Sequence, residues 1–280
     1  MTIFTESKNS LIDNALIRNV MEEINLSVTK NGQQFSTLNQ LAQPSDITRQ
    51  LANQAIVEPS ADARTQGAYL INQLSWRLVS IVCFLDLSQL SLNALWNGRI
   101  GVLDAWRFSD LDGETQPYAT YEWHLDELEP CTQPLAAEQL GKQLIEIMTP
   151  FIAEVHHQTR FSKAAQWRLL TDSITAVYLH AGKQFNTVEE AKARASDIIE
   201  STGKPLANAQ WHFKEFNVSA QSSPTGETLK EWFRIRGGCC RYYTTEAGRY
   251  CSTCVHLDEN EQQQRFENYL FTLAVNAAPN

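Results

Sequence analysis

The chain has 280 residues, of which 43% are hydrophobic and 20% are charged, a composition typical of a globular protein with a sizeable core. Its formal net charge of −9 argues against extensive nucleic-acid binding. The first residues mix acidic and basic side chains among apolar ones, so we expect no signal peptide.

The first third of the chain alternates between helical patterns and polar stretches. Apolar residues at helical spacing predict a helix within 11–26, and the polar stretch 33–59 predicts loop with short helices. Residues 67–95 predict one or two buried helices. The longest apolar run there, 78–90, contains polar residues and is shorter than the roughly 20 apolar residues of a spanning helix. We therefore expect a core helix and no membrane span.

Branched and aromatic residues become frequent after residue 98. Two such runs are separated by a segment that contains Asp112 and Gly113, a dipeptide that favours a tight turn. Residues 99–126 therefore predict a β-hairpin.

Three helices are expected in the middle of the chain. Apolar faces at helical spacing predict the first over 140–155 and the second over 167–178. Thr187 and Glu190 have the spacing of a capping box and predict a third helix that ends near Gly203.

The C-terminal third predicts a small sheet followed by a helix. Alternating patterns predict strands at 211–216 and 231–236, and apolar residues at helical spacing predict an amphipathic helix in 258–280. The expected fold class is α+β, mostly helical, with a small antiparallel sheet and a C-terminal cysteine segment. We expect a mostly helical domain over 1–225, the cysteine segment over 226–257, and the terminal helix.

Four of the six cysteines lie within sixteen positions and are spaced C-C-x10-C-x2-C. They are Cys239, Cys240, Cys251 and Cys254. We expect the protein to be cytoplasmic, because neither a signal peptide nor a membrane span is predicted. Disulfides are therefore disfavoured, since thiols stay reduced in the cytoplasm. Four cysteine ligands suit both zinc and a 2Fe–2S cluster, and the spacing leaves both open.

The adjacency of the first two cysteines favours the cluster. Neighbouring side chains are awkward ligands for one tetrahedral ion, whereas two irons offer separated positions. Gly237 and Gly238 precede the pair, and we expect them to supply a positive φ that lets the two side chains diverge. Backbone N–H groups of Gly238, Arg241 and Ser252 are candidates to donate hydrogen bonds to sulfur.

Basic residues surround the cysteines although the whole chain is acidic. Five cationic side chains and two acidic ones lie between Lys230 and Cys254. The candidate contacts to an anionic substrate are Arg234, Arg236, Arg241 and Arg249.

The remaining cysteines and the nearest histidine have simpler interpretations. Cys83 lies in an apolar run and Cys131 beside Pro130, and a free cysteine packs as a small hydrophobe. His256 is the one histidine near the four cysteines. We expect it to face solvent or to couple to protons rather than to bind a metal.

The cysteine motif resembles that of the FhuF-like siderophore ferric reductases, whose C-terminal C-C-x10-C-x2-C binds a 2Fe–2S cluster. Basic and apolar residues lead into the pair in that family, as "EWFRIRGG" does at 231–238. The aromatic helix expected at 167–179 is also similar. One departure is the acidic, amphipathic segment that follows Cys254 here.

The resemblance implies a function, with residues 1–225 as the mostly helical siderophore-binding domain and residues 226–257 as the C-terminal iron–sulfur cysteine segment. It implies that the four cysteines bind a 2Fe–2S cluster, and that the protein is an oxidoreductase that passes single electrons to siderophore-bound iron(III) and releases iron(II). The substrate would be a ferric siderophore of hydroxamate, citrate-hydroxamate or carboxylate type, and the donor a ferredoxin or flavoprotein. We expect a cytoplasmic monomer, free or peripheral to the inner membrane. The alternative is a zinc- or cluster-bearing binding or regulatory module in iron handling, without turnover.

Overall fold

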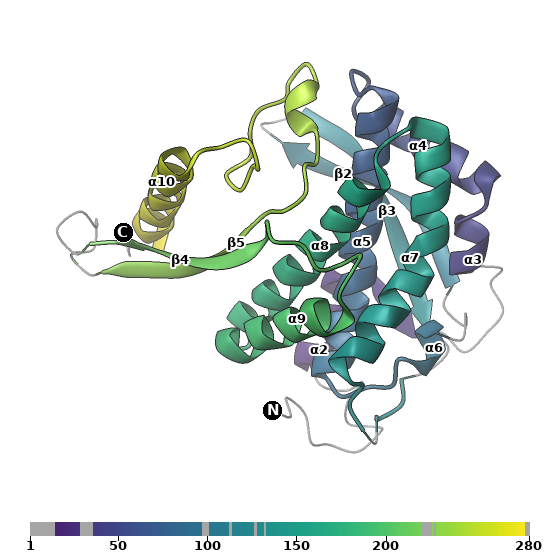
Figure 1. Cartoon of the computed structure of the whole chain (residues 1–280), viewed down its shortest axis with the longest axis horizontal. Coiled ribbons are helices and arrows are strands. Elements are labelled where there is room, and N and C mark those ends of the chain that lie inside the picture. The colour runs from purple at the N-terminus through teal and green to yellow at the C-terminus, as the bar shows by residue number, and fades with distance from the viewer. Residues whose placement is uncertain are drawn as a thin grey trace.

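Helices form most of the computed structural model, which describes residues 15–28, 36–96, 101–111, 114–125, 128–131, 133–219, 226 and 228–277. Two small sheets accompany them (Figure 1). The predicted α+β class with a predominance of helix is confirmed.

The centre of the molecule is a bundle of long helices. α5 (Ala63–Leu87), α7 (Ala137–Thr159), α8 (Lys163–Gln184) and α9 (Val188–Thr202) pack together, with α4 (Pro44–Val57) against α5 and α7. Their apolar faces form one large core, because each helix has buried side chains at helical spacing. The three helices predicted in the middle of the chain are confirmed.

α5 contains the most apolar run of the sequence. Among the described residues it is the one helix whose length and hydropathy would suit a membrane span, but 72% of its most apolar window is buried inside the protein. Leu74, Leu78 and Ile81 are each fully buried. The predicted core helix is therefore confirmed. It begins where the Asp62 side chain accepts a hydrogen bond from the Thr65 backbone N–H.

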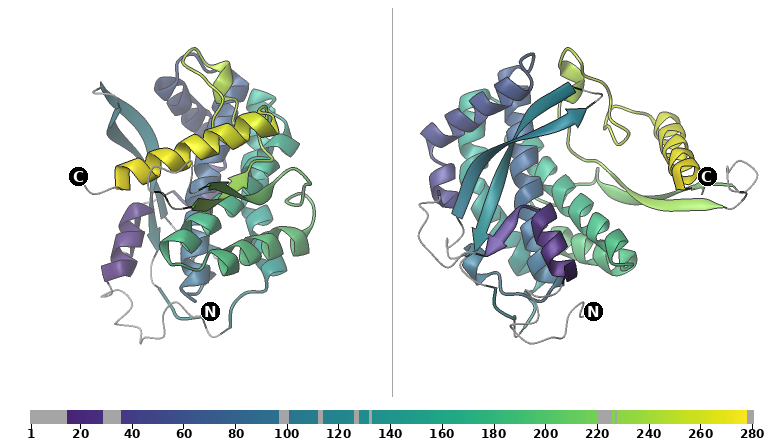
Figure 2. Two further views of the ribbon diagram at one scale, coloured as in Figure 1. Left: turned by 90° about the vertical axis from the view of Figure 1, so that its left-hand side faces the viewer. Right: turned by 180° about the vertical axis from the view of Figure 1, so that it is seen from behind.

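A three-stranded sheet lies against the bundle, in the order β1-β3-β2 (Figure 2). β2 (Gly101–Leu111) and β3 (Glu114–Leu125) are antiparallel, with Leu111 opposite Glu114, so the hairpin is confirmed. Its turn residues, Asp112 and Gly113, lie outside the described residues. β1 (Leu26–Val28) pairs parallel with β3 and was not predicted, because three residues carry too little pattern to recognise.

The second sheet joins the C-terminal helix to form a small lobe. β4 (His212–Val218) and β5 (Leu229–Ile235) are antiparallel, and α10 (Glu259–Ala277) packs across them. Phe266 of α10 lies 4.3 Å from Phe216 and 4.2 Å from Phe233, measured between ring centroids. The yellow α10 projects to one side of the bundle with this sheet (Figures 1 and 2). The predicted strands and terminal helix are confirmed. The domain boundary expected at 225 lies outside the described residues.

The shorter helices differ from the sequence expectations in detail. α2 (Ala15–Glu23) falls within the predicted 11–26, and α3 (Leu38–Leu41) and α6 (Asn93–Trp96) are single turns. The polar stretch 33–59 predicted only short helices, but α4 is 14 residues long. A helix on the surface of a protein requires apolar residues on one face only, so a polar composition does not prevent it. Thr187 precedes α9 but its side chain makes no capping hydrogen bond, so the predicted capping box is wrong.

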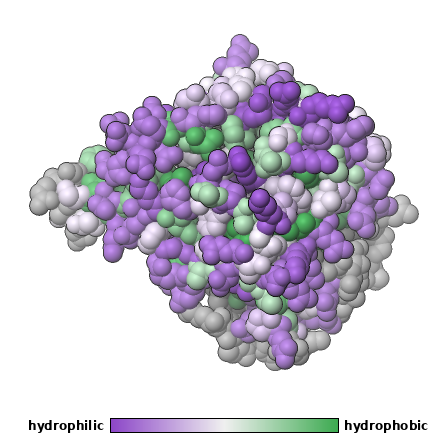
Figure 3. Space-filling model, in the orientation of Figure 1, coloured by the Kyte–Doolittle hydropathy of each residue, from purple (hydrophilic) through white to green (hydrophobic). Residues whose placement is uncertain are grey.

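The surface seen in Figure 3 is mostly hydrophilic, and its apolar residues form scattered patches. No single large apolar face appears in this view.

Candidate functional site: the cysteine segment

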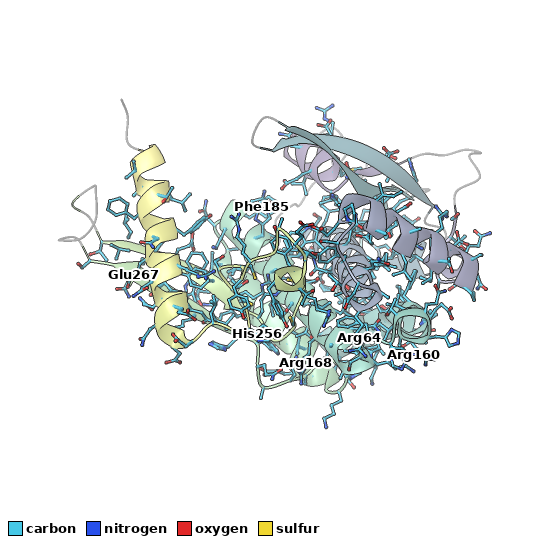
Figure 4. The ribbon with its side chains drawn as sticks, turned by 90° about the horizontal axis from the view of Figure 1, so that it is seen from above. Arg64, Arg160, Arg168, Phe185, His256 and Glu267 are labelled. Carbon is cyan, nitrogen blue, oxygen red and sulfur yellow. The ribbon has the colours of Figure 1, made fainter. Side chains whose placement is uncertain are left out.

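The cysteine segment, residues 236–258, runs from the end of β5 to the start of α10. It has little regular structure apart from the short 3₁₀ helix η1 (Tyr242–Thr244). Figure 4 shows His256 on this segment, between α10 and the helical bundle. The segment is therefore held at the junction of the two parts of the molecule.

The side chains of the adjacent cysteines point in different directions. The Cys239 sulfur lies 3.7 Å from His256 Nε2, whereas Cys240 lies close enough to Cys251 for each to shift the pKa of the other. Cys254 is close enough to both Cys239 and Cys251 for their charges to raise its pKa, after the larger effect of burial. All four predicted cysteines thus share one locality, with the neighbouring pair divergent.

Each of the four sulfurs lies near the backbone N–H of the residue two positions further along the chain. The Arg241 N–H donates a hydrogen bond to Cys239 Sγ at 3.4 Å. The N–H groups of Tyr242, Thr253 and His256 act to lower the pKa values of Cys240, Cys251 and Cys254, respectively. Such donors stabilise thiolates and tune metal–sulfur groups.

Of the three N–H donors expected from the sequence, only Arg241 is found. The Gly238 N–H is directed to a carboxylate instead, and the backbone N–H that lowers the pKa of Cys251 is that of Thr253 rather than Ser252.

A fully buried carboxylate supports the start of the segment. Asp172, in the middle of α8, accepts hydrogen bonds from the backbone N–H groups of Gly237 at 2.8 Å and Gly238 at 3.0 Å. It also accepts one from Arg236 Nε at 3.1 Å. The Asp172 backbone carbonyl accepts a further bond from Arg234 Nη1 at 2.8 Å. This network fixes the chain immediately before the cysteine pair.

Two guanidinium groups therefore lie inward, next to the cysteines. Burial and neighbouring Arg236 lower the pKa of Arg234 to about 10. Burial would also lower the pKa of Arg236, but the charges of Asp172, Cys240 and Cys251 outweigh it and hold that pKa above its usual value. Arg236 Nη2 is buried and has no hydrogen-bond partner. One carboxylate against two guanidiniums leaves positive charge that anionic sulfur ligands would offset.

The thiol pair Cys240 and Cys251 is unequal. The neighbouring Cys251 thiol, followed by burial, raises the pKa of Cys240. The neighbouring Cys240 thiol, together with nearby Arg236, lowers the pKa of Cys251 despite its burial. A cysteine with a lowered pKa supplies thiolate, the form that binds metals.

The role expected for the two glycines is wrong. Within the described residues, positive φ among glycines occurs at Gly203 and Gly226 and not at Gly237 or Gly238. The glycines instead allow close approach: a Cβ on Gly238 would lie 3.0 Å from both the Arg168 backbone and Asp172 Oδ2. The residue with positive φ beside the cysteines is Arg241, at 61°.

The four arginines predicted to contact a substrate have different environments. Arg234 and Arg236 point to Asp172. Arg241 forms an ion pair with Asp62 at 3.0 Å and donates to Thr65 Oγ1 at 3.1 Å, which anchors the segment to the start of α5. Arg249 is exposed and is the member of this set that faces solvent.

An aromatic cluster covers the outer side of the segment. Tyr243, Tyr250 and His256 lie with ring centroids 4.8 to 5.8 Å apart, and both tyrosines are exposed. His256 therefore contacts the Cys239 sulfur on one side and aromatic rings on the other.

All six cysteines fall within the described residues and carry free thiols. Cys83 is buried in the core, and burial raises its pKa well above the usual value, as expected for a core residue. The Cys131 thiol donates to the Gln133 carbonyl at 2.7 Å. Neither lies in the cysteine segment.

By chemical type, the donor set of the segment suits a metal–thiolate group. Four sulfurs, backbone N–H groups beside them and two inward guanidiniums are groups that stabilise an anionic metal–sulfur centre. As the side chains stand, no group of three or more His, Cys, Asp or Glu residues in the described parts of the chain is placed to hold a metal ion. No family model, curated protein sequence or solved structure matches the chain.

Asp172 is the main residue that sequence reasoning missed. It lies between Thr171 and Ser173 in an otherwise apolar helical pattern, and a polar residue on a buried helix face requires partners. This polar residue on an apolar helix face could have been predicted to be buried and hydrogen-bonded. The sequence could not have shown that its partners are the N–H groups of Gly237 and Gly238.

Proposed function

We propose that the protein is a ferric-siderophore reductase in which Cys239, Cys240, Cys251 and Cys254 hold a 2Fe–2S cluster. The observation that carries the proposal is the divergence of the adjacent cysteines, with Cys239 beside His256 and Cys240 beside Cys251. Ligands that diverge suit a group with two metal centres better than one tetrahedral ion. The resemblance of the motif to that of the FhuF-like reductases supports the same choice.

When bound, such a cluster supplies one electron at a time. The iron(III) of the chelate gains that electron and becomes iron(II). Hydroxamate and carboxylate oxygens are hard ligands that hold iron(III) more tightly than iron(II), so the metal is released after reduction. A reduced ferredoxin or flavoprotein would replace the electron, and no nucleophile or general base is required.

The residues of the chain have three tasks in this scheme. Asp172 holds the start of the cysteine segment through Gly237 and Gly238. The backbone N–H groups of residues 241, 242, 253 and 256 would stabilise negative charge on the four sulfurs of a bound cluster. The inward guanidiniums of Arg234 and Arg236 would stabilise the additional negative charge of the reduced form.

The test is reoxidation of the reduced protein. The protein is reduced under anaerobic conditions, freed of excess reductant and mixed with a panel of ferric siderophores, while iron(II) is trapped by a coloured chelator. We expect reoxidation together with stoichiometric iron(II) for at least one chelate. The Cys131→Ser variant is the control that retains activity, because Cys131 lies outside the segment. Reoxidation no faster than in oxygen-free buffer would favour a non-catalytic binding or regulatory module.

A further inference from the structure

A cleft of about 500 Å³ lies between α9, the chain that follows it, and the β4–β5 sheet. These elements converge at the centre of Figure 1. Its lining includes three aromatic side chains, Trp211, Phe213 and Trp232. The volume is within the range of small-molecule sites, and aromatic walls with a few polar groups are typical of them.

The aromatic walls are held in place by contacts within the protein. The Trp211 and Phe213 rings meet edge to face with centroids 5.8 Å apart. Lys192 Nζ lies 3.0 Å from the centre of the Trp232 ring. Lys192 is itself buried and paired with Glu189 at 2.9 Å. Flat faces fixed in this way lose little conformational freedom when a ligand stacks on them.

The cleft adjoins the start of the cysteine segment. A Cβ on Gly237 would lie 2.7 Å from Asn208 Oδ1 and 3.3 Å from the Trp211 backbone nitrogen, and both Asn208 and Trp211 line the cleft. Two residues span at most about 7 Å of extended chain, so Cys239 follows closely. By contrast, the cleft beside α2 holds about 90 Å³, which is too small for a chelate.

The charged side chains at the cleft leave no excess of positive charge. Lys192 is paired with Glu189, and Glu200 is a further acidic residue of the lining. Arg234 and Arg236, which the sequence suggested as contacts for an anion, bind Asp172 instead. No surplus of positive charge is therefore directed into the cleft, and a strongly anionic ligand would gain little there.

We propose that this cleft binds the ferric chelate, and that it selects a chelate with flat, uncharged outer surfaces over a highly anionic one. The inference rests on the proposed function for the identity of the ligand. The site itself is defined by the aromatic walls of the cleft, its volume, its lack of excess positive charge and its contact with Gly237.

The test separates binding from electron transfer by using gallium(III) complexes, which have the shape of the iron(III) complexes but accept no electron. Affinities of the full chain for a neutral trihydroxamate complex and for a triply negative catecholate complex are measured by calorimetry. We expect tighter binding of the neutral complex, and an affinity at least about tenfold weaker in Trp232→Ala and Trp211→Ala, as for central aromatic contacts elsewhere. Trp76→Ala is the control, because Trp76 is an exposed tryptophan of α5 outside this cleft.

Glu200→Lys is a second variant that is safe for folding, because Glu200 is exposed on α9. We expect it to tighten binding of the triply negative complex several-fold and to leave the neutral complex nearly unchanged. Equal affinities for wild type, Trp232→Ala and Trp211→Ala would overturn the inference, even where wild type reduces iron chelates and the proposed function stands. Gallium binding that depends on the two tryptophans would support the cleft, even where no reduction occurs and the proposed function fails.

Discussion

The replacement Asp172→Asn tests how the helical bundle controls the cysteine segment. Asp172 is fully buried and accepts hydrogen bonds from Gly237, Gly238 and Arg236. Asparagine keeps the shape but removes the charge, and its NH₂ group cannot accept a bond. Since Arg236 would lose its buried partner, we expect the free energy of unfolding of the metal-free protein to fall by about 3–5 kcal/mol.

The cluster-loaded protein should lose less stability, because its anionic sulfur ligands remain near the two guanidiniums. Its reduction potential should rise, since a negative charge is removed from its surroundings. At a separation of roughly 8–15 Å and an effective dielectric constant of about 20, the interaction is about 1–2 kcal/mol. For a one-electron couple this corresponds to roughly 40–90 mV.

The assay combines chemical denaturation of both forms with a spectroscopic redox titration. Asp86→Asn is the matched control, because Asp86 is another buried carboxylate that binds an arginine, Arg194, but on the α5–α9 side of the bundle. It should lower stability without moving the potential. A potential for Asp172→Asn that shifts no more than in this control would refute the reasoning and leave Asp172 a structural residue alone.

Three further predictions concern the segment and its supports. Serine at any one of the four clustered cysteines should abolish iron retention, measured by metal analysis and visible absorption, whereas Cys131→Ser should retain it. Asp62→Ala should lower the free energy of unfolding by about 1–2 kcal/mol, because the side chain caps α5 and binds Arg241. Partial burial would raise the pKa of Asp62, but Thr65 and Arg241 lower it overall. The contribution of the Asp62 carboxylate to stability is therefore present at neutral pH and is lost as the pH falls through the lowered pKa. Wild type and variant should thus have similar free energies of unfolding in urea denaturation at acidic pH. Phe266→Ala removes a ring from the centre of the lobe formed by β4, β5 and α10 and should lower the free energy of unfolding by about 3–5 kcal/mol. Phe271→Ala, on the exposed side of the same helix, should change it by no more than about 0.5 kcal/mol. Similar losses of stability for the two variants would contradict the packing described.

The long helices and both hairpins could be predicted because their patterns are local. The apolar faces over 140–155 and 167–178 mark α7 and α8 directly, and the alternation at 231–236 marks β5. The three-residue β1 could not be predicted, since its pairing with β3 depends on contacts almost 100 positions apart.

The candidate site could likewise be predicted only in part. The spacing of the four cysteines is visible in the sequence, but Asp172 lies more than 60 positions from the glycines it binds. The arginines illustrate the limit further. Composition alone suggested a basic landing surface, whereas the structure turns Arg234 and Arg236 inward and pairs Arg241 with Asp62. The number of charged residues in a segment does not show which way each side chain points, because that depends on the partner that the side chain binds in the folded protein.

The central claim is that the four cysteines hold a 2Fe–2S cluster. The most direct measurement is anaerobic purification followed by metal and sulfide analysis, with an EPR spectrum of the reduced protein. The account predicts a red-brown protein with about two irons and two sulfides per chain and a 2Fe–2S signal on reduction. A colourless protein that contains about one zinc per chain and gives no such signal would contradict it.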